Sequence, residues 1–78
     1  MREKKPALII TFPSTAAAME AESFCQEQGL PGRIIPVPRE ITAGCGLAWR
    51  APPEAEAALT GALGAAGLAW SDARVLEV

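Results

Sequence analysis

The chain has 78 residues, half of them hydrophobic, and a formal net charge of −2. This length suits one domain with one hydrophobic core, and the apolar content is typical of a globular fold rather than of a disordered chain. Net negative charge argues against nucleic acid as a partner, because domains that bind it carry basic surfaces. No apolar run approaches the roughly 20 residues that cross a bilayer, so no membrane partner is expected.

The chain contains two cysteines and no histidine. Four nitrogen or sulfur ligands for zinc cannot be assembled from these residues, and we expect neither a metal nor a resident cofactor. Catalysis by Cys/His or Ser/His/Asp arrangements is excluded for the same reason. The apolar run at 7–12 is too short for the core of a signal peptide, which predicts a cytoplasmic protein. In that reducing compartment a disulfide between Cys25 and Cys45 is not expected.

The first half of the chain reads as a strand followed by a helix. Residues 7–12 (Ala-Leu-Ile-Ile-Thr-Phe) form an apolar run with β-branched members, typical of a buried strand. Pro13 ends this strand, and the hydroxyl residues Ser14 and Thr15 can cap a helix. The helix is predicted over 15–28, which contains no proline or glycine, with Gly29 as its C-terminal cap.

The second half repeats the strand and helix pattern. A strand is predicted at 33–37, and Pro36 within it favours a sheet edge, where a missing N–H group does no harm. A further strand is predicted at 46–51, with Leu47 and Trp49 on one face. A helix follows from 52–54 and ends at Gly67, and the last strand is predicted at 74–78.

This order of elements predicts an α+β fold, the ferredoxin-like split βαβ sandwich (βαββαβ), as a single domain over 1–78. Its four-stranded antiparallel sheet has the strand order 4-1-3-2, and both helices cover one face. The second strand lies at an edge in this topology. Pro36 and Pro38 agree with that position independently of the helix count.

The predicted topology gives Cys45 a specific neighbourhood. The first and third strands are antiparallel neighbours, so the end of one lies beside the start of the other. Cys45 should therefore face the N-terminus of the first helix, where free N–H groups and the positive end of the helix dipole favour a thiolate. Ser14 and Thr15 are candidate hydrogen-bond donors to that thiolate, and Arg39 and Arg50 are candidate positive charges.

Cys45 also lies between Gly44 and Gly46, which leave its sulfur without side-chain cover. The alternative is an inert cysteine in a tight hairpin, since free cysteines often serve only in packing. Cys25 is expected to be such a packing residue on the first helix. Arg33, like Arg39 and Arg50, could bind an anion, although it is more typical of an ordinary surface charge.

Several segments of the chain resemble a family of small bacterial proteins, the Se/S carrier protein-like family, formerly catalogued as a domain of unknown function. The resemblance spans nearly the whole chain and rests on residues 11–15 (Thr-Phe-Pro-Ser-Thr), 27–31 (Glu-Gln-Gly-Leu-Pro), 35–41 (Ile-Pro-Val-Pro-Arg-Glu-Ile) and 44–48 (Gly-Cys-Gly-Leu-Ala). It implies a role in handling sulfur or selenium, with Cys45 at the position of the family's cysteine.

Two functions follow from these observations. The first is a carrier that holds a persulfide or selenopersulfide on Cys45 between a donor and an acceptor protein. A carrier needs no general base of its own, which suits a chain without histidine better than a turnover enzyme would. The alternative is a non-catalytic module for protein interaction or small-ligand sensing. Such a module could form a homodimer through the sheet face left open by the helices, for which Ile9, Ile35 and Trp49 are candidates.

Overall fold

The computed structural model describes residues 5–37 and 46–77; residues 1–4, 38–45 and 78 lie outside the described part of the chain. Within these two described ranges, four strands, two α-helices and one short 3-10 helix follow one another. In chain order they are β1 (Pro6–Thr11), α1 (Thr15–Gln28), β2 (Arg33–Pro36), β3 (Leu47–Ala51), the 3-10 helix η1 (Pro53–Ala55), α2 (Glu56–Ala65) and β4 (Asp72–Glu77).

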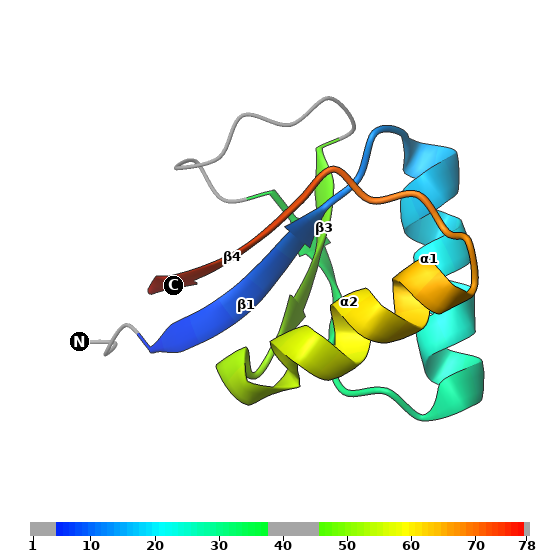
Figure 1. Ribbon diagram of the computed structural model, residues 1–78. Coiled ribbons are helices and arrows are strands. Elements are labelled where there is room, and N and C mark those ends of the chain that lie inside the picture. Colours follow the sequence, from blue (N-terminus) through cyan, green and yellow to red (C-terminus); the bar gives the residue numbers. More distant parts are fainter. Residues whose placement is uncertain (1–4, 38–45, 78) are drawn as a thin grey trace.

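The strands form one sheet in the order β2-β3-β1-β4, and every neighbouring pair is antiparallel. Both α-helices lie on the same side of this sheet (Figure 1). The predicted ferredoxin-like α+β fold is therefore confirmed, including the strand order and the edge position of β2. Pro36 belongs to that edge strand, where its lack of an N–H group costs no sheet hydrogen bond.

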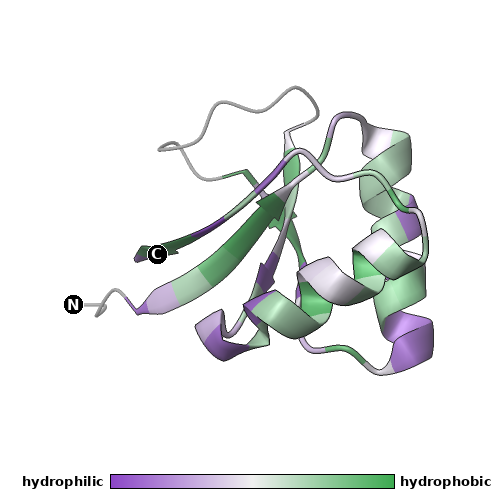
Figure 2. Cartoon of the chain, in the orientation of Figure 1, coloured by the Kyte–Doolittle hydropathy of each residue, from purple (hydrophilic) through white to green (hydrophobic). Residues whose placement is uncertain are grey.

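The central strand β1 is buried on both of its faces. Leu8 and Ile10 point toward the helices and are fully buried, while Ile9, between them, is fully buried on the opposite face beside Ala48. This explains why β1 is hydrophobic along most of its length in Figure 2 instead of alternating with polar residues. The short apolar run in the sequence is thus the signature of a strand enclosed by other elements.

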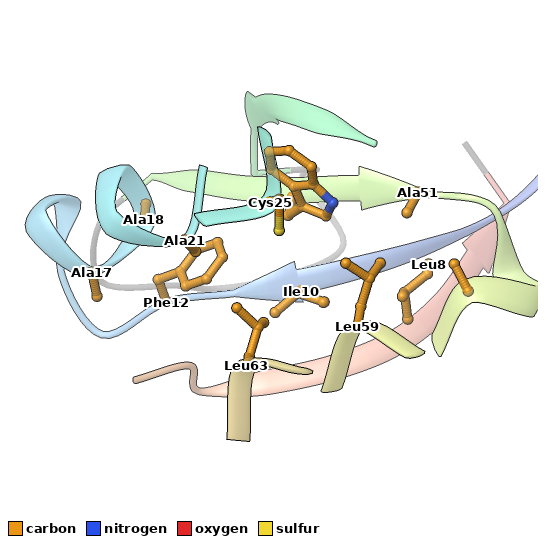
Figure 3. Close-up of a cluster of buried hydrophobic side chains, with 12 residues drawn as sticks. Leu8, Ile10, Phe12, Ala17, Ala18, Ala21, Cys25, Ala51, Leu59 and Leu63 are labelled. Atoms are coloured by element: carbon orange, nitrogen blue, oxygen red, sulfur yellow. The ribbon is translucent and has the colours of Figure 1, made fainter. Parts of the chain in front are cut away.

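The main core fills the space between the sheet and the helices. Figure 3 shows side chains from β1, α1 and α2 converging there, including Phe12, Cys25, Leu59 and Leu63. Each fully buried Leu, Ile or Phe side chain contributes roughly 1.5–3 kcal/mol relative to an exposed one. The helices are held mainly by this burial, because α2 has only ten residues and is too short to be stable alone.

The ends of α1 agree with the prediction made from its flanking residues. The Ser14 side chain accepts a hydrogen bond from the backbone N–H of Ala17 at 3.1 Å, which makes Ser14 the N-cap. Gly29 adopts a left-handed conformation with φ of 68°, and its N–H lies toward the last carbonyl groups of the helix. Local sequence therefore sets both boundaries of this helix.

Other element boundaries differ from the prediction by one or two residues. β1 begins at Pro6 and β3 at Leu47, and β4 runs over Asp72–Glu77 rather than 74–78. In each case pairing with the neighbouring strand decides the limit: Asp72 pairs with Thr11, so β4 starts as soon as it meets the end of β1. The helix predicted from residue 52 begins with the 3-10 turn η1.

Trp49 does not line the open face of the sheet, so that part of the dimer hypothesis was wrong. It is 2% exposed and belongs to the core on the helix side, because it alternates with Ala48, which faces the other way. Its indole N–H donates a hydrogen bond to the carbonyl oxygen of Pro31 at 3.0 Å. The indole thereby ties the segment before β2 to the middle of the sheet.

Gly32 makes this arrangement of the indole possible. Its φ of 121° is one that residues with a side chain rarely adopt. A Cβ atom at this position would lie 2.7 Å from Cε2 of Trp49 and 2.6 Å from the carbonyl oxygen of Arg50. Only glycine fits at this position, against the Trp49 indole and the backbone of β3.

We therefore predict that Gly32→Ala lowers the free energy of unfolding by about 2 kcal/mol or more, through backbone strain and overpacking. Urea denaturation followed by circular dichroism measures this change. The matched control is Gly61→Ala on the exposed side of α2, where an added Cβ meets nothing within 4 Å. That change should stabilise the helix by about 0.5–1 kcal/mol. Equal effects of the two substitutions would contradict the proposed role of Gly32.

Candidate functional site

One end of the sheet brings together the end of β1 and the beginning of β3. Thr11 is paired with Ala48, so the residues after Thr11 and those before Ala48 leave the sheet at the same end. There Ser14 and Thr15 begin α1, and Gly46 leads into β3. We call this group, Pro13, Ser14, Thr15 and Gly46, the α1 rim. The predicted proximity of the end of β1 to the start of β3 is therefore confirmed. Cys45 itself lies outside the described residues.

The α1 rim carries the positive end of the α1 dipole, and the first turn of the helix has no charged side chain. No acidic residue lies in that turn, so nothing within it offsets the positive end of the helix dipole. The Ser14 hydroxyl oxygen accepts from the Ala17 N–H, and the Ser14 carbonyl accepts from the Ala18 N–H at 3.1 Å. A helix start of this kind favours a nearby anion such as a thiolate.

Gly46 gives the rim an open surface. It is exposed, its φ is 75°, and a Cβ atom placed on it would meet nothing within 4 Å. Its carbonyl oxygen accepts a hydrogen bond from the Val37 N–H at 3.0 Å, which continues the β2–β3 pairing by one step. The chain therefore enters β3 at a point that solvent and other molecules can reach.

The structure places the predicted site residues at different ends of the sheet. Ser14 and Thr15 lie at the α1 rim. Arg50 lies near the other end of β3, four residues from Gly46, which at roughly 3.3 Å per residue is about 13 Å along the strand. Cys45 and Arg39 lie outside the described residues. The participation of all five side chains in one site stays a prediction.

A fourth arginine belongs to an ion pair on the edge strand. Arg74 Nε donates to Asp72 Oδ2 at 2.6 Å, and both side chains are substantially exposed. Asp72 pairs with Thr11 and so lies at the same end of the sheet as the α1 rim. The Arg74 guanidinium therefore offsets the charge of the Asp72 carboxylate at that end of β4.

The face of the sheet without helices offers little exposed apolar surface in the described part of the chain. As expected, Ile9 and Ile35 lie there, but Ile9 is fully buried and Ile35 partly so. The large hydrophobic residues exposed within 5–37 and 46–77 are Met19 on α1 and Val75 on β4. Val75 pairs with Leu8 and hence lies on the helix side. The homodimer through the open face therefore remains a prediction without direct support.

Cys25 occupies the main core, as the sequence predicted. It is a free thiol, 1% exposed, and Figure 3 shows it projecting from α1 into the cluster beneath the helices. Desolvation by burial raises the pKa of the Cys25 thiol above its ordinary value, because the apolar surroundings disfavour the charged thiolate. Cys25 is thus unsuited to nucleophilic chemistry in the folded protein.

We predict that a Cys45→Ser variant, whose remaining thiol is Cys25, resists alkylation by iodoacetamide in native buffer and reacts in denaturant. Intact mass measures the reaction. A raised pKa in the folded state also means that this contribution to stability is complete below the ordinary thiol pKa and is lost as the pH rises through the folded-state pKa. Cys25→Ala should abolish this alkaline loss. Fast native alkylation of Cys25 would contradict its burial.

Within residues 5–37 and 46–77, no group of three His, Cys, Asp or Glu side chains could hold a metal ion. No helix among these residues has the length and apolarity needed to cross a membrane.

The opposite end of the sheet holds a basic pocket that the sequence did not reveal as a site. Its lining includes Lys5, Arg33 and Arg50, which are far apart along the chain. Arg33 and Arg50 were each recognised as possible anion ligands, but no local sequence pattern indicates that they lie together. The missing signal was the register of the β2–β3 hairpin, which determines that the two residues are paired.

The fold and the α1 rim together define a small α+β ferredoxin-like domain with a positive, open helix start beside one end of its sheet. A family model described as "Putative Se/S carrier protein-like" matches residues 7–73, and the chain belongs to this family. The match confirms the resemblance found from the sequence segments. No curated protein and no solved structure matches the chain.

Proposed function

We propose that the protein is a sulfur or selenium carrier that holds a persulfide or selenopersulfide on Cys45. The single observation that carries the proposal is membership of the Se/S carrier family over 7–73, a range that includes this cysteine. Cys25 is buried and has a raised pKa, so of the two cysteines Cys45 is the candidate for the exchange chemistry.

The loading reaction needs only an accessible thiolate and a donor persulfide. The Cys45 thiolate attacks the outer sulfur of a donor R–S–SH, a new S–S bond forms to Cys45, and the donor's S–S bond breaks. The donor leaves as the thiolate R–S⁻, and the product is Cys45–S–SH. No net oxidation occurs and no further reactant is needed. A donor R–S–SeH would transfer selenium by the same steps.

The geometry of the α1 rim supports this assignment. Cys45 is bonded to Gly46, which is exposed and lies at the end of the sheet where α1 begins. Ser14 and Thr15 at that helix start are the described residues best placed to stabilise a thiolate there. Arg39 remains a candidate through its charge. Arg50 is the weakest candidate because it belongs to the far end of β3.

We infer that the partners are a protein donor and a protein acceptor of the chalcogen, and that the protein works in the cytoplasm. Exchange between proteins requires that both reach the same thiol in turn, which an open rim permits. The chain would then act as a carrier without turnover chemistry of its own, in keeping with a sequence that has no histidine for acid–base catalysis.

The first test is direct loading of the thiol. Wild-type protein incubated with glutathione persulfide should gain roughly 32 Da, one sulfur atom, on intact mass measurement. Cys25→Ala should gain the same mass, and Cys45→Ser should gain none. Peptide mapping of the loaded protein assigns the adduct to one cysteine. Absence of the adduct, or an adduct on Cys25, would show that the proposal is wrong.

The second test measures how reactive the thiol is. In the Cys25→Ala variant, the alkylation rate as a function of pH should give a Cys45 thiol pKa below the roughly 8.5 of an unperturbed cysteine. Thr15→Val, which removes a hydroxyl from the α1 rim but leaves the Ser14 cap, should slow alkylation at neutral pH. Thr60→Val on α2, whose hydroxyl donates to Glu56 in its own helix, is the matched control. A thiol pKa near 8.5 in all variants would favour an inert cysteine.

A further inference from the structure

Two arginines face each other on neighbouring strands near the end of the sheet opposite the α1 rim. Arg33 of β2 and Arg50 of β3 are direct partners in the antiparallel register. Side chains in this relation project from the same face with Cβ atoms about 4.5–5.5 Å apart. Two like charges placed there repel each other and destabilise the sheet unless a counter-charge lies between them.

Within the described part of the chain, no carboxylate lies within ion-pair distance of either arginine. Within residues 5–37 and 46–77 the ion pair is between Arg74 and Asp72, and neither Arg33 nor Arg50 has an acidic partner. Arg74 makes a useful comparison because it belongs to the same cross-strand row: it pairs with Ile9, which in turn pairs with Arg50. One arginine of the row is neutralised, and the other two are not.

Arg33 and Arg50 help to line a pocket of about 400 Å³. Lys5 adds a third positive charge to its lining and Glu54 one negative charge, which leaves a local excess of two positive charges. This excess stands out in a chain whose formal net charge is −2. The remaining walls are small and apolar and come from Pro6, Ala7, Gly32, Ala51, Pro52 and Pro53.

Gly32 keeps one corner of this pocket free. A Cβ atom on Gly32 would lie 2.6 Å from the carbonyl oxygen of Arg50, against the strand that carries one of the two arginines. Glycine therefore lets the chain enter β2 close enough for Arg33 to stand opposite Arg50. Gly32 thus has two effects. It lets Arg33 lie opposite Arg50, and it leaves room for the indole of Trp49 to reach Pro31.

We propose that this pocket binds a phosphate group, either free phosphate or the phosphate of a small phosphomonoester. Arginine forks bind phosphate oxygens through paired hydrogen bonds, and two opposed forks with an ammonium group suit a tetrahedral anion. The local excess of two positive charges matches a phosphate dianion, the form of a phosphomonoester that predominates above about pH 6. The volume leaves room for a small organic group against Pro52 and Pro53. The proposal is independent of Cys45.

The experiment compares wild-type protein with three glutamine variants at constant ionic strength set with chloride. Binding of inorganic phosphate and of phenyl phosphate is followed by ³¹P NMR titration. Arg33→Gln and Arg50→Gln should each weaken binding by about tenfold or more, because each removes a charge-assisted pair of hydrogen bonds. Arg74→Gln, in the same row but outside the pocket lining, should bind as the wild type does.

Thermal unfolding provides a second test, in which phosphate should reverse the order of the unfolding temperatures of the variant and the wild type. Non-specific charge screening cannot produce such a reversal. Without phosphate, Arg33→Gln should unfold at a higher temperature than the wild type, because the repulsion with Arg50 is gone. With saturating phosphate the order should reverse, because the wild type binds phosphate more tightly and so gains more binding free energy than the variant. Arg74→Gln should show no such reversal. The shift in unfolding temperature on adding phosphate is also measured within each protein, so a general loss of stability in a variant does not obscure it.

Tighter binding of phenyl phosphate than of inorganic phosphate identifies a phosphomonoester as the ligand class, and equal binding identifies free phosphate. Benzoate, which has the same ring with a carboxylate, should bind at least about tenfold more weakly than phenyl phosphate. Equal binding of benzoate would overturn the assignment to phosphate. Equal phosphate binding by the Arg33, Arg50 and Arg74 variants would overturn the site itself.

Discussion

The antiparallel pairing of β1 with β3 is the constraint on which the rest of the structure depends. With Thr11 opposite Ala48, the end of β1 and the start of β3 emerge together, and α1 begins at the same place. The same register sends the start of β1 and the end of β3 to the other end, beside the start of β2. The β1–β3 pairing therefore builds the α1 rim, and together with the β2–β3 pairing it builds the basic pocket.

Packing on both faces of β1 holds this register. A shift by one residue would exchange Ile9 with Leu8 or Ile10, and would move the helix-side core to the wrong face. The indole of Trp49 adds a second restraint through its hydrogen bond to Pro31, since the segment before β2 must stay against β3. The positions proposed to be functional at both ends are thus set by apolar side chains that have no role in the proposed chemistry.

The two ends of the sheet differ in how they present positive potential. At the α1 rim it comes from the backbone N–H groups of a helix start whose first turn has no acidic residue, which suits a single thiolate close by. At the other end it comes from Lys5, Arg33 and Arg50, which suit a multiply charged oxyanion. A net charge of −2 for the whole chain conceals both features, since it averages over surfaces of opposite sign.

Local sequence alone determined the elements whose ends depend on neighbouring residues: the hydroxyl cap at Ser14, the left-handed Gly29, and with them α1 and the order of strands and helices. It also singled out Cys45, which lies beyond the described residues and remains a prediction. Only tertiary structure decided the start of β4, the inward face of Trp49 and the opposition of Arg33 and Arg50. Those features depend on register between distant segments, and register is set by the joint packing of both sheet faces rather than by any single stretch of chain.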